Sequence, residues 1–205
     1  MKQTDIFLIH SRHDTYLPNF FDKAGAKANI RLWEAEWFEM EGPAWSNLKE
    51  QIKRCKAVFV LKGPNIAASL YTSNWVSWEI GVASSMEKDV WVFEPLRSPV
   101  FMPIPFLTDY VVYDANDYGH VVFVANLLES YGQGQPVFPG IPTACPFCYI
   151  QYNVHTALNS WNCPACQRSV AWTQQLTSIP GDVIEPQGGL IDFAIAYPGV
   201  DQGQR

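Results

Sequence analysis

Short apolar runs along this chain alternate with longer stretches in which apolar residues recur at helical spacing. These segments predict strands at 5–10, 30–33, 57–61, 90–93 and 110–113. Residues 6–9 and 57–61 are continuously apolar, which is typical of parallel strands buried on both faces. Helices are expected at 14–28, with Asp14 as a cap, and at 43–54, 72–87 and 116–131. Five strands that alternate with helices predict an α/β fold with a parallel sheet and right-handed crossovers.

The sequence after residue 131 does not continue this alternation of strands and helices. Residues 132–142 are rich in Gly, Pro and Gln, which is typical of a linker. This linker is expected to separate a domain at 1–131 from a smaller module with its tail at 143–205. Within the tail, apolar residues alternate along 190–197 and predict a half-buried strand.

Composition narrows the class of protein. Hydrophobic residues make up 48% of the 205 residues, which is enough to form a core and excludes a disordered chain. No apolar run approaches the roughly 20 residues of a membrane span. Residues 1–5 lead directly into the first strand without the pattern of a signal peptide. We therefore expect a cytoplasmic protein with no membrane partner.

Four of the five cysteines form two Cys-x-x-Cys pairs, Cys145 with Cys148 and Cys163 with Cys166, separated by 14 residues. Four thiolates on two tight turns make a closed tetrahedral site of the kind that binds structural zinc. Redox pairs or free thiols are the alternatives. The pattern resembles a zinc ribbon. Cys55, which precedes a buried strand, is expected to be an inert core thiol.

Charge argues against a nucleic-acid partner. The net charge is −6, and residues 98–205 carry 2 basic against 8 acidic residues. The segment 143–172 contains one charged residue, Arg168, although its aromatic side chains are able to stack on bases. Such aromatic residues more commonly cover a small core or a protein interface. We therefore expect a protein partner at the ribbon rather than DNA or RNA.

Polar residues gather where the predicted strands end. His10, Ser11 and Arg12 leave the first strand, and residues 63–65 leave the third. In an open parallel sheet, ligands bind at the carboxyl ends of the strands. The helix expected next carries Glu79, so these segments together predict a ligand site.

Two of these segments resemble motifs of bacterial TIR domains. Residues 5–14, Asp-Ile-Phe-Leu-Ile-His-Ser-Arg-His-Asp, resemble the opening TIR motif, and residues 73–79, Ser-Asn-Trp-Val-Ser-Trp-Glu, resemble the Ser-x-Trp-x-x-x-Glu stretch. The resemblance covers about 1–131 and implies a flavodoxin-like sheet. It also implies NAD cleavage with Glu79 as the catalytic glutamate, self-association in which the loop at 41–45 reaches a neighbour, and a role in antiviral defence or NAD-derived signalling.

The chemistry of that reaction fits a single carboxylate. Breaking the nicotinamide–ribose bond develops positive charge on the ribose, which a carboxylate stabilises. Nicotinamide is a cationic leaving group and needs no general acid. Glu79 lies between Trp75 and Trp78 in sequence, in apolar company that strengthens the interaction. The ordinary alternative is a solvated helix residue without a catalytic role. For a catalytic Glu79 we expect a half-exposed helical position, where a change to glutamine leaves stability almost unchanged.

Candidate substrate-binding residues surround Glu79 in this interpretation. His10 either binds substrate or makes an ordinary hydrogen bond at a strand end. Ser11 and Arg12 are candidates for phosphate contacts, and Trp37 and Trp75 for contacts with the rings of NAD. The alternative function is a non-enzymatic TIR assembly module, with the ribbon as a second protein contact.

Overall fold

A computed structural model describes residues 4–11, 13–28, 30–34, 44–134, 140–156, 160–172 and 194–196. The helices are α1 (Tyr16–Lys27), α2 (Ala44–Arg54), α3 (Pro64–Ala67), α4 (Leu70–Ser85) and α5 (Tyr118–Gln133). The first strands are β1 (Thr4–Ile9), β2 (Ile30–Glu34), β3 (Ala57–Leu61), β4 (Asp89–Pro95) and β5 (Asp109–Tyr113). The later strands are β6 (Ile141–Ala144), β7 (Gln151–His155), β8 (Ser160–Asn162), β9 (Ser169–Trp172) and β10 (Ala194–Ala196). Within these described ranges, no helix has the length and apolar character needed to cross a bilayer.

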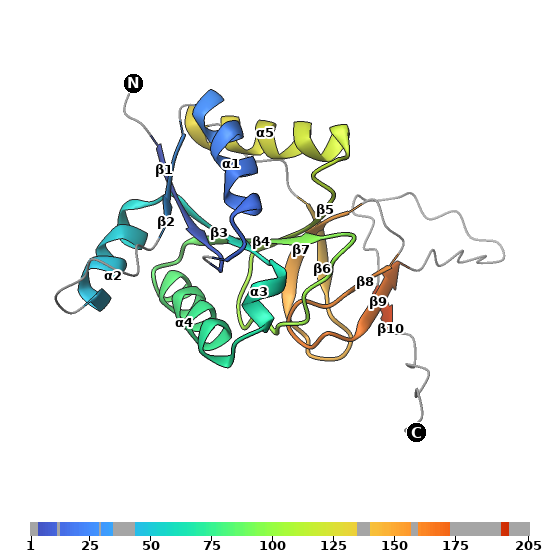
Figure 1. Cartoon of the computed structure of the whole chain (residues 1–205). Coiled ribbons are helices and arrows are strands. Elements are labelled where there is room, and N and C mark those ends of the chain that lie inside the picture. The colour runs from blue at the N-terminus through green and yellow to red at the C-terminus, as the bar shows by residue number, and fades with distance from the viewer. Residues whose placement is uncertain are drawn as a thin grey trace, which may run out of the picture.

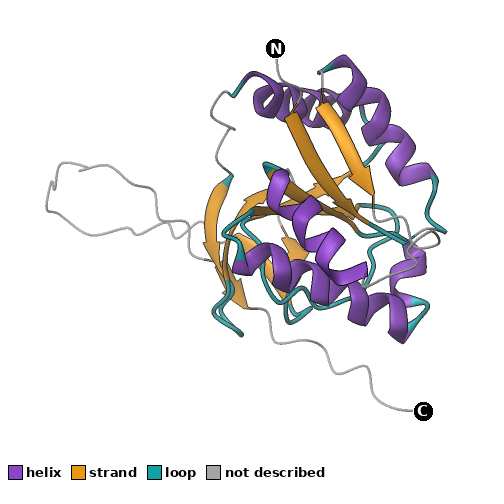
Figure 2. Cartoon of the chain, turned by 90° about the vertical axis from the view of Figure 1, so that its left-hand side faces the viewer, coloured by secondary structure: helices purple, strands orange, loops and turns teal. Residues whose placement is uncertain are grey.

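The main sheet has seven strands in the order β2-β1-β3-β4-β5-β7-β6. All its neighbouring pairs are parallel except the hairpin of β6 and β7. Helices α1 and α5 lie on one side of the sheet and α4 on the other (Figure 1), and Figure 2, turned by 90°, also shows helices on both sides of the strands. The α/β, flavodoxin-like fold predicted from the sequence is confirmed.

Each face of the sheet has its own core, because side chains alternate along a strand. One face carries Ile6, Leu8 and Phe59 and packs on aromatic and aliphatic residues of α1 and α5. The opposite face carries Phe7 and Val58 and packs on α2 and α4. Burial on both sides explains why every residue of β3 is buried and why its sequence is continuously apolar.

The sheet continues beyond the five predicted strands. β7 pairs with β5 in parallel, and the amide of Asn153 donates to the carbonyl of Thr108 at 2.8 Å. β6 begins inside the predicted linker, so the main sheet includes the first part of the cysteine-containing segment. The division into 1–131, 132–142 and 143–205 stays a prediction, and β10 lies within the strand predicted at 190–197.

The cysteine turns cover a part of the α2/α4 face of the sheet that these helices do not reach. The segment between β4 and β5 is irregular, as its three prolines predict, so no crossover helix packs there. Instead, Trp161 and Cys163 join the same core as the strands. Trp161 Nε1 donates to Tyr152 Oη at 2.9 Å, and the amide of Ile104 donates to the carbonyl of Pro164 at 2.7 Å. The turns therefore take the place of a covering helix.

One local prediction is wrong. Asp14 does not cap α1, whose N-cap is Thr15 without a side-chain hydrogen bond. The carboxylate of Asp14 instead accepts hydrogen bonds from Asn65, at 3.2 Å from the amide and 2.6 Å from Nδ2. Asp14 is fully buried, and the two donors of Asn65 satisfy it there.

Candidate functional site

A cavity of about 400 Å³ opens at the carboxyl ends of β1 and β3. The strand order changes direction here, because β1 lies between β2 and β3, and ligands bind at such points of open α/β sheets. One wall comes from the end of β1, with His10 and Ser11. The other comes from α3 and the start of α4, with Asn65, Thr72 and Trp75. The topology thus brings two segments distant in sequence to one cavity.

His10 is held at the rim of this cavity by two contacts. Its Nε2 lies 3.2 Å from Glu34 Oε2, and its Nδ1 lies 2.9 Å from the carbonyl of Ser11. Burial opposes the charged form of His10, but the hydrogen bonds to Glu34 and to Ser11 raise its pKa overall. The same contact lowers the pKa of Glu34. His10 therefore carries more positive charge near neutral pH than a free histidine does.

Ser11 and Asn65 fix the two walls relative to each other. Ser11 is 2% exposed, and its Oγ accepts a hydrogen bond from the amide of His13 at 3.3 Å. Asn65 is tied to Asp14 from the β1 side of the cavity. Ser69 caps α4 by accepting from the amide of Thr72 at 3.4 Å. The cavity therefore has a preorganised polar rim next to the positive end of the α4 dipole.

Glu79 lies one helical turn after Trp75 and is buried. It is 3% exposed, so the expectation of a half-exposed residue is wrong. Desolvation raises the pKa of its carboxyl to about 8, and a hydrogen bond with the Trp75 side chain partly offsets this rise. The ring of Trp75 lies 5.1 Å from that of Trp78. The apolar surroundings predicted for Glu79 are confirmed, and Glu79 is more deeply buried than the sequence indicates.

The structure brings together some of the predicted site residues. His10, Ser11 and Trp75 line one cavity, while Glu79 follows Trp75 without lining it. Arg12 and Trp37 lie outside the described residues. Among the described residues lining the cavity, none is a lysine or an arginine.

Sequence reasoning missed part of the cavity wall. Asn65 was expected only as part of a break after the third strand, and Ser69 and Thr72 were not singled out. A serine three residues before a threonine at a helix start is the signal that marks this wall in the sequence.

The four predicted metal ligands converge. Their Sγ atoms all lie within 4.8 Å of one another. Cys145 Sγ lies 3.6 Å from Cys166 Sγ, and Cys148 Sγ lies 3.8 Å from Cys163 Sγ. Tetrahedral zinc with bonds of about 2.3 Å places sulfur atoms roughly 3.8 Å apart. The donor set and its spacing therefore fit a zinc ion.

Cys55 differs from the four converging cysteines. It is 1% exposed and lies between α2 and β3. Burial raises the pKa of its thiol to about 12. A thiol in this state is a poor nucleophile and a poor metal ligand. The predicted burial of Cys55 in the core is confirmed, and its inertness stays a prediction.

A buried ion pair lines the same cavity as the metal ligand Cys163. Lys62 follows β3, Glu94 lies on β4, and they are 3% and 5% exposed. Lys62 Nζ donates to Glu94 Oε2, which also accepts from Tyr110 Oη at 3.3 Å. Burial lowers the pKa of Lys62, and the negative charges of Glu94 and Cys163 oppose this effect. Sequence reasoning missed this pair, although a charged residue within an apolar strand is its signal.

Comparison with known proteins gives similarities of structure. The TIR domains of the activated Roq1 resistosome, which recognises the pathogen effector XopQ, match 63% of this chain and 84% of their own, with 12% identity and a TM-score of 0.35. A diflavin flavoprotein A3 from Nostoc sp. matches 65% of this chain and 94% of its own, with 14% identity and a TM-score of 0.41. The glutaminase domain of CTPS from Trypanosoma brucei matches 45% of this chain and 36% of its own, with 17% identity and a TM-score of 0.31.

The sequence comparisons give no match. No protein-family model matches the chain, and no curated protein matches it. The function of the site is therefore inferred from its own residues.

Proposed function

We propose that this protein cleaves the nicotinamide–ribose bond of NAD, with Glu79 as the catalytic carboxylate. The observation that carries the proposal is the cavity at the carboxyl edge of β1 and β3, which is lined by His10, Ser11 and Trp75 and lies one helical turn from the buried Glu79. Arg12 and Trp37 remain proposed substrate contacts from the sequence. Release of nicotinamide by the purified chain tests the activity.

The reaction needs little from the protein beyond charge and exclusion of water. The bond between C1′ of the ribose and the nicotinamide nitrogen breaks, and nicotinamide leaves neutral with the bonding electron pair. Positive charge then develops at C1′, and the Glu79 carboxylate stabilises it in surroundings of low dielectric. Water, or a nucleophile within ADP-ribose itself, adds to C1′ and releases a proton. We propose that His10 and the start of α4 hold the diphosphate.

The raised pKa of Glu79 makes the proposed activity pH-dependent. The carboxyl titrates at about 8, so only a minor fraction is ionised at pH 7. We expect kcat/KM to rise by about tenfold per pH unit below that value and to level off above it, because the free enzyme must lose this proton. Initial rates between pH 6 and 9.5 measure the profile. If Glu79 is the group that titrates, kcat/KM of a His10→Asn variant still rises with pH over the same range. If that rise is lost in the variant, the titrating group is His10 instead.

We propose that the four cysteines hold a structural zinc ion. A site closed by four thiolates leaves no open position for water or substrate, so the ion stabilises the turns and takes no part in the reaction. Purified reduced protein should contain one zinc per chain by elemental analysis, and absence of any metal would contradict this.

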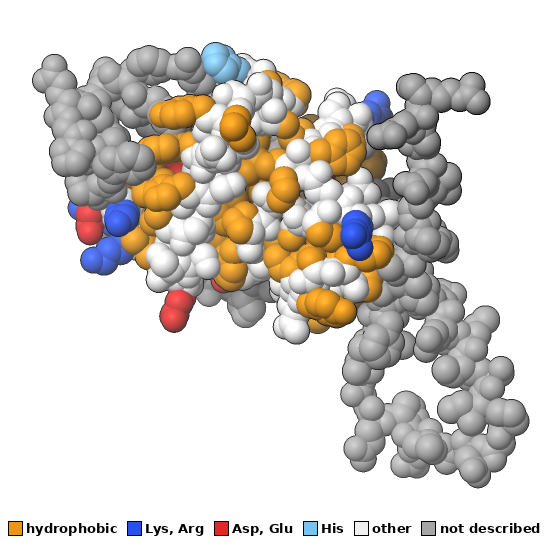
Figure 3. Space-filling view, turned by 90° about the horizontal axis from the view of Figure 1, so that it is seen from below, with side chains coloured by type: hydrophobic (Ala, Val, Ile, Leu, Met, Phe, Trp, Pro, Cys, Tyr) orange, Lys and Arg blue, Asp and Glu red, His pale blue; other side chains and the backbone are white. Residues whose placement is uncertain are grey.

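Self-association is the second candidate function, and α4 favours it. Glu79 is the only charged residue of this helix and is buried, while Leu70 and Tyr71 at its start are 77% and 68% exposed. On the described part of the face seen in Figure 3, hydrophobic side chains are interspersed with uncharged polar side chains and backbone, and charged side chains are few. Such a surface suits another protein, including a second copy of this chain, better than water. Roles in antiviral defence or NAD-derived signalling belong with the proposed NAD cleavage and not with self-association.

Generic nucleic acids should bind weakly. Arg168 is the only basic residue along 143–172, and its guanidinium lies 4.7 Å from the ring of Phe147. A protein that neutralises few phosphates gains little from counterion release. We expect no binding of unrelated double-stranded DNA or RNA below about 10 μM protein at 150 mM salt. Fluorescence anisotropy measures this, and submicromolar binding that falls with salt would refute it.

A further inference from the structure

The buried Lys62–Glu94 pair has no role in the proposed NAD site, yet burying two charges is costly. Both side chains lose most of their hydration, and such a pair commonly adds little stability compared with apolar residues of the same shape. A contribution to stability therefore does not explain why this pair is buried, and the residues around the pair indicate another role.

Glu94 and Lys62 differ in how much of their hydrogen-bonding capacity is used. Both carboxylate oxygens of Glu94 are used, since Oε2 accepts from Lys62 and Tyr110 and Oε1 accepts from the amide of Val100. Lys62 Nζ has three N–H donors and gives one to Glu94. The ammonium therefore keeps donor capacity, while the carboxylate is saturated and holds it in place.

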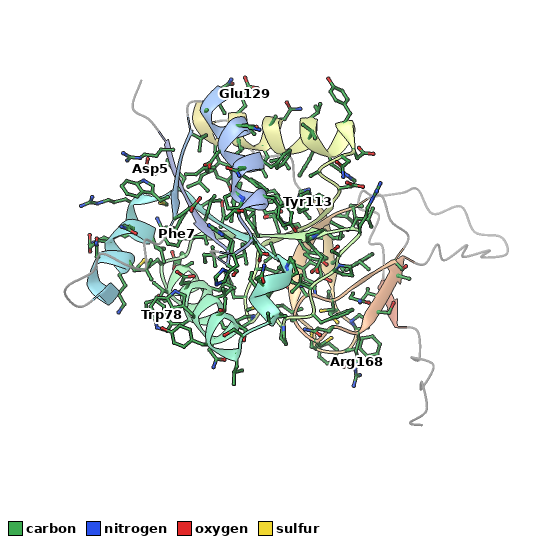
Figure 4. All side chains as sticks on the ribbon, in the orientation of Figure 1. Asp5, Phe7, Trp78, Tyr113, Glu129 and Arg168 are labelled. Carbon is green, nitrogen blue, oxygen red and sulfur yellow. The ribbon has the colours of Figure 1, made fainter. Side chains whose placement is uncertain are left out.

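The cavity that Lys62 lines is shared with the second cysteine turn. Lys62 and Cys163 line one cavity of about 210 Å³ together with Asn162 and Gln167 of the second cysteine turn. Figure 4 shows the sulfur atoms of this region on the lower side of the sheet, near Arg168. Arg168 is engaged with the ring of Phe147. Among the described residues lining this cavity, Lys62 is the only lysine or arginine.

A zinc ion bound by four thiolates retains excess negative charge, since four negative ligands outweigh two positive charges. In a buried site this charge needs compensation by donors around the sulfur atoms. Cys163 and Cys145 are both fully buried, so this charge is compensated by protein groups and not by water. Backbone N–H groups of the turns donate to both sulfur atoms, and Lys62, which lines the same cavity as Cys163, adds a full positive charge.

We propose that Lys62 is the counter-cation of the metal–thiolate centre, and that Glu94 positions its ammonium. The inference rests on the proposed zinc site and deepens it: the main sheet contributes a residue to metal binding through the end of β3. Lys62 is a positioning residue in this role and touches no reacting group.

Removing either the positive or the negative charge of the pair distinguishes this role from that of a purely structural ion pair. Lys62→Met leaves the negative charge of Glu94 near the thiolates, whereas Glu94→Gln leaves the positive charge of Lys62. A counter-cation role predicts that Lys62→Met weakens zinc binding by about 10- to 100-fold, the scale for residues that support metal ligands. Glu94→Gln should then bind zinc as tightly as the wild type or more tightly.

Competition for zinc against a chromophoric chelator, on full-length reduced protein, measures these affinities. Lys56→Met is the matched control, because Lys56 is exposed at the opposite end of β3 and should bind zinc normally. The double variant Lys62→Met with Glu94→Gln buries no unpaired charge, and it should fold and still bind zinc more weakly than Glu94→Gln alone.

The outcomes are distinct. Opposite effects of the two single changes support the inference. Equal weakening by both, or wild-type affinity in the folded double variant, overturns it and leaves the pair structural. A wild-type protein that holds no zinc at all overturns the zinc site itself, which is a separate result.

Discussion

Replacing Glu79 by glutamine should lower the rate of NAD cleavage by at least about 100-fold, the scale on which a single electrostatic stabiliser acts. Glutamine keeps the shape and an acceptor oxygen for Trp75, and it removes the charge that stabilises the developing cation. Nicotinamide release at saturating NAD and at pH 8.5, where the wild-type carboxyl is ionised, measures the change. Glu50→Gln, an exposed change on α2, is the control and should retain full activity.

The same change should stabilise the protein, contrary to what the sequence alone indicates. The pKa of Glu79 is about 8 in the folded state and near 4.5 when unfolded. Between these values the unfolded chain loses a proton that the folded protein keeps, so the wild type loses stability as pH rises from about 4.5 to 8. Glutamine does not titrate. At pH 7 the variant should therefore be more stable by up to about 3 kcal/mol.

Thermal unfolding at pH 5 and pH 8 checks this sign. The difference in midpoint between Glu79→Gln and the wild type should grow toward pH 8. An inactive variant that is also less stable at pH 8 would mean that Glu79 supports the fold. A folded variant that turns over NAD at the normal rate would remove Glu79 from the mechanism.

Removing the metal should destabilise the α/β core together with the cysteine turns. The turns replace a helix over β4, β5 and β7, and Cys145 and Cys163 belong to the same core as the strands. Structural zinc contributes about 10 kcal/mol or more to such sites, and 1 kcal/mol shifts the midpoint of a domain of this size by about 2–4 °C. We expect a chelator, under reducing conditions, to lower the midpoint of the single unfolding transition by at least about 10 °C.

Near-ultraviolet circular dichroism follows this transition, because Trp91 and Tyr110 report on the sheet. Added zinc should restore the original midpoint. Cys163→Ser should behave like the chelated protein, and Cys55→Ala, which changes a buried thiol outside the cluster, should retain the metal. A separate low-temperature transition with an unchanged main one would instead support an independent module after 132–142.

The fold was largely predictable because its signals are local. Continuous apolar runs such as 57–61 are typical of central parallel strands, and the structure places them there. The hairpin of β6 and β7 was not predictable in this way. Its partner β5 lies far away in sequence, and nothing in the local pattern of 141–155 shows that it extends the main sheet.

The candidate sites were predictable to the same extent: features of a short segment were found, and contacts between distant segments were missed. The cysteine spacing predicted a convergent cluster, because a metal site imposes its geometry on short turns. The burial of Glu79 was missed, because a lone glutamate in a helix is usually exposed. The residues that bury it come from other parts of the fold. The same holds for Asp14 and Lys62, whose partners Asn65 and Glu94 come from other strands or turns.

The most direct test of the proposed function is the fate of NAD incubated with the purified wild-type chain. The protein should be reduced and zinc-loaded, at pH 8.5 and at concentrations high enough for self-association, with Glu79→Gln in parallel. Chromatography should show nicotinamide appearing together with ADP-ribose or a cyclised form of it, in equal amounts, only with the wild type. Intact NAD in both samples would contradict the assignment and leave self-association as the function of this fold.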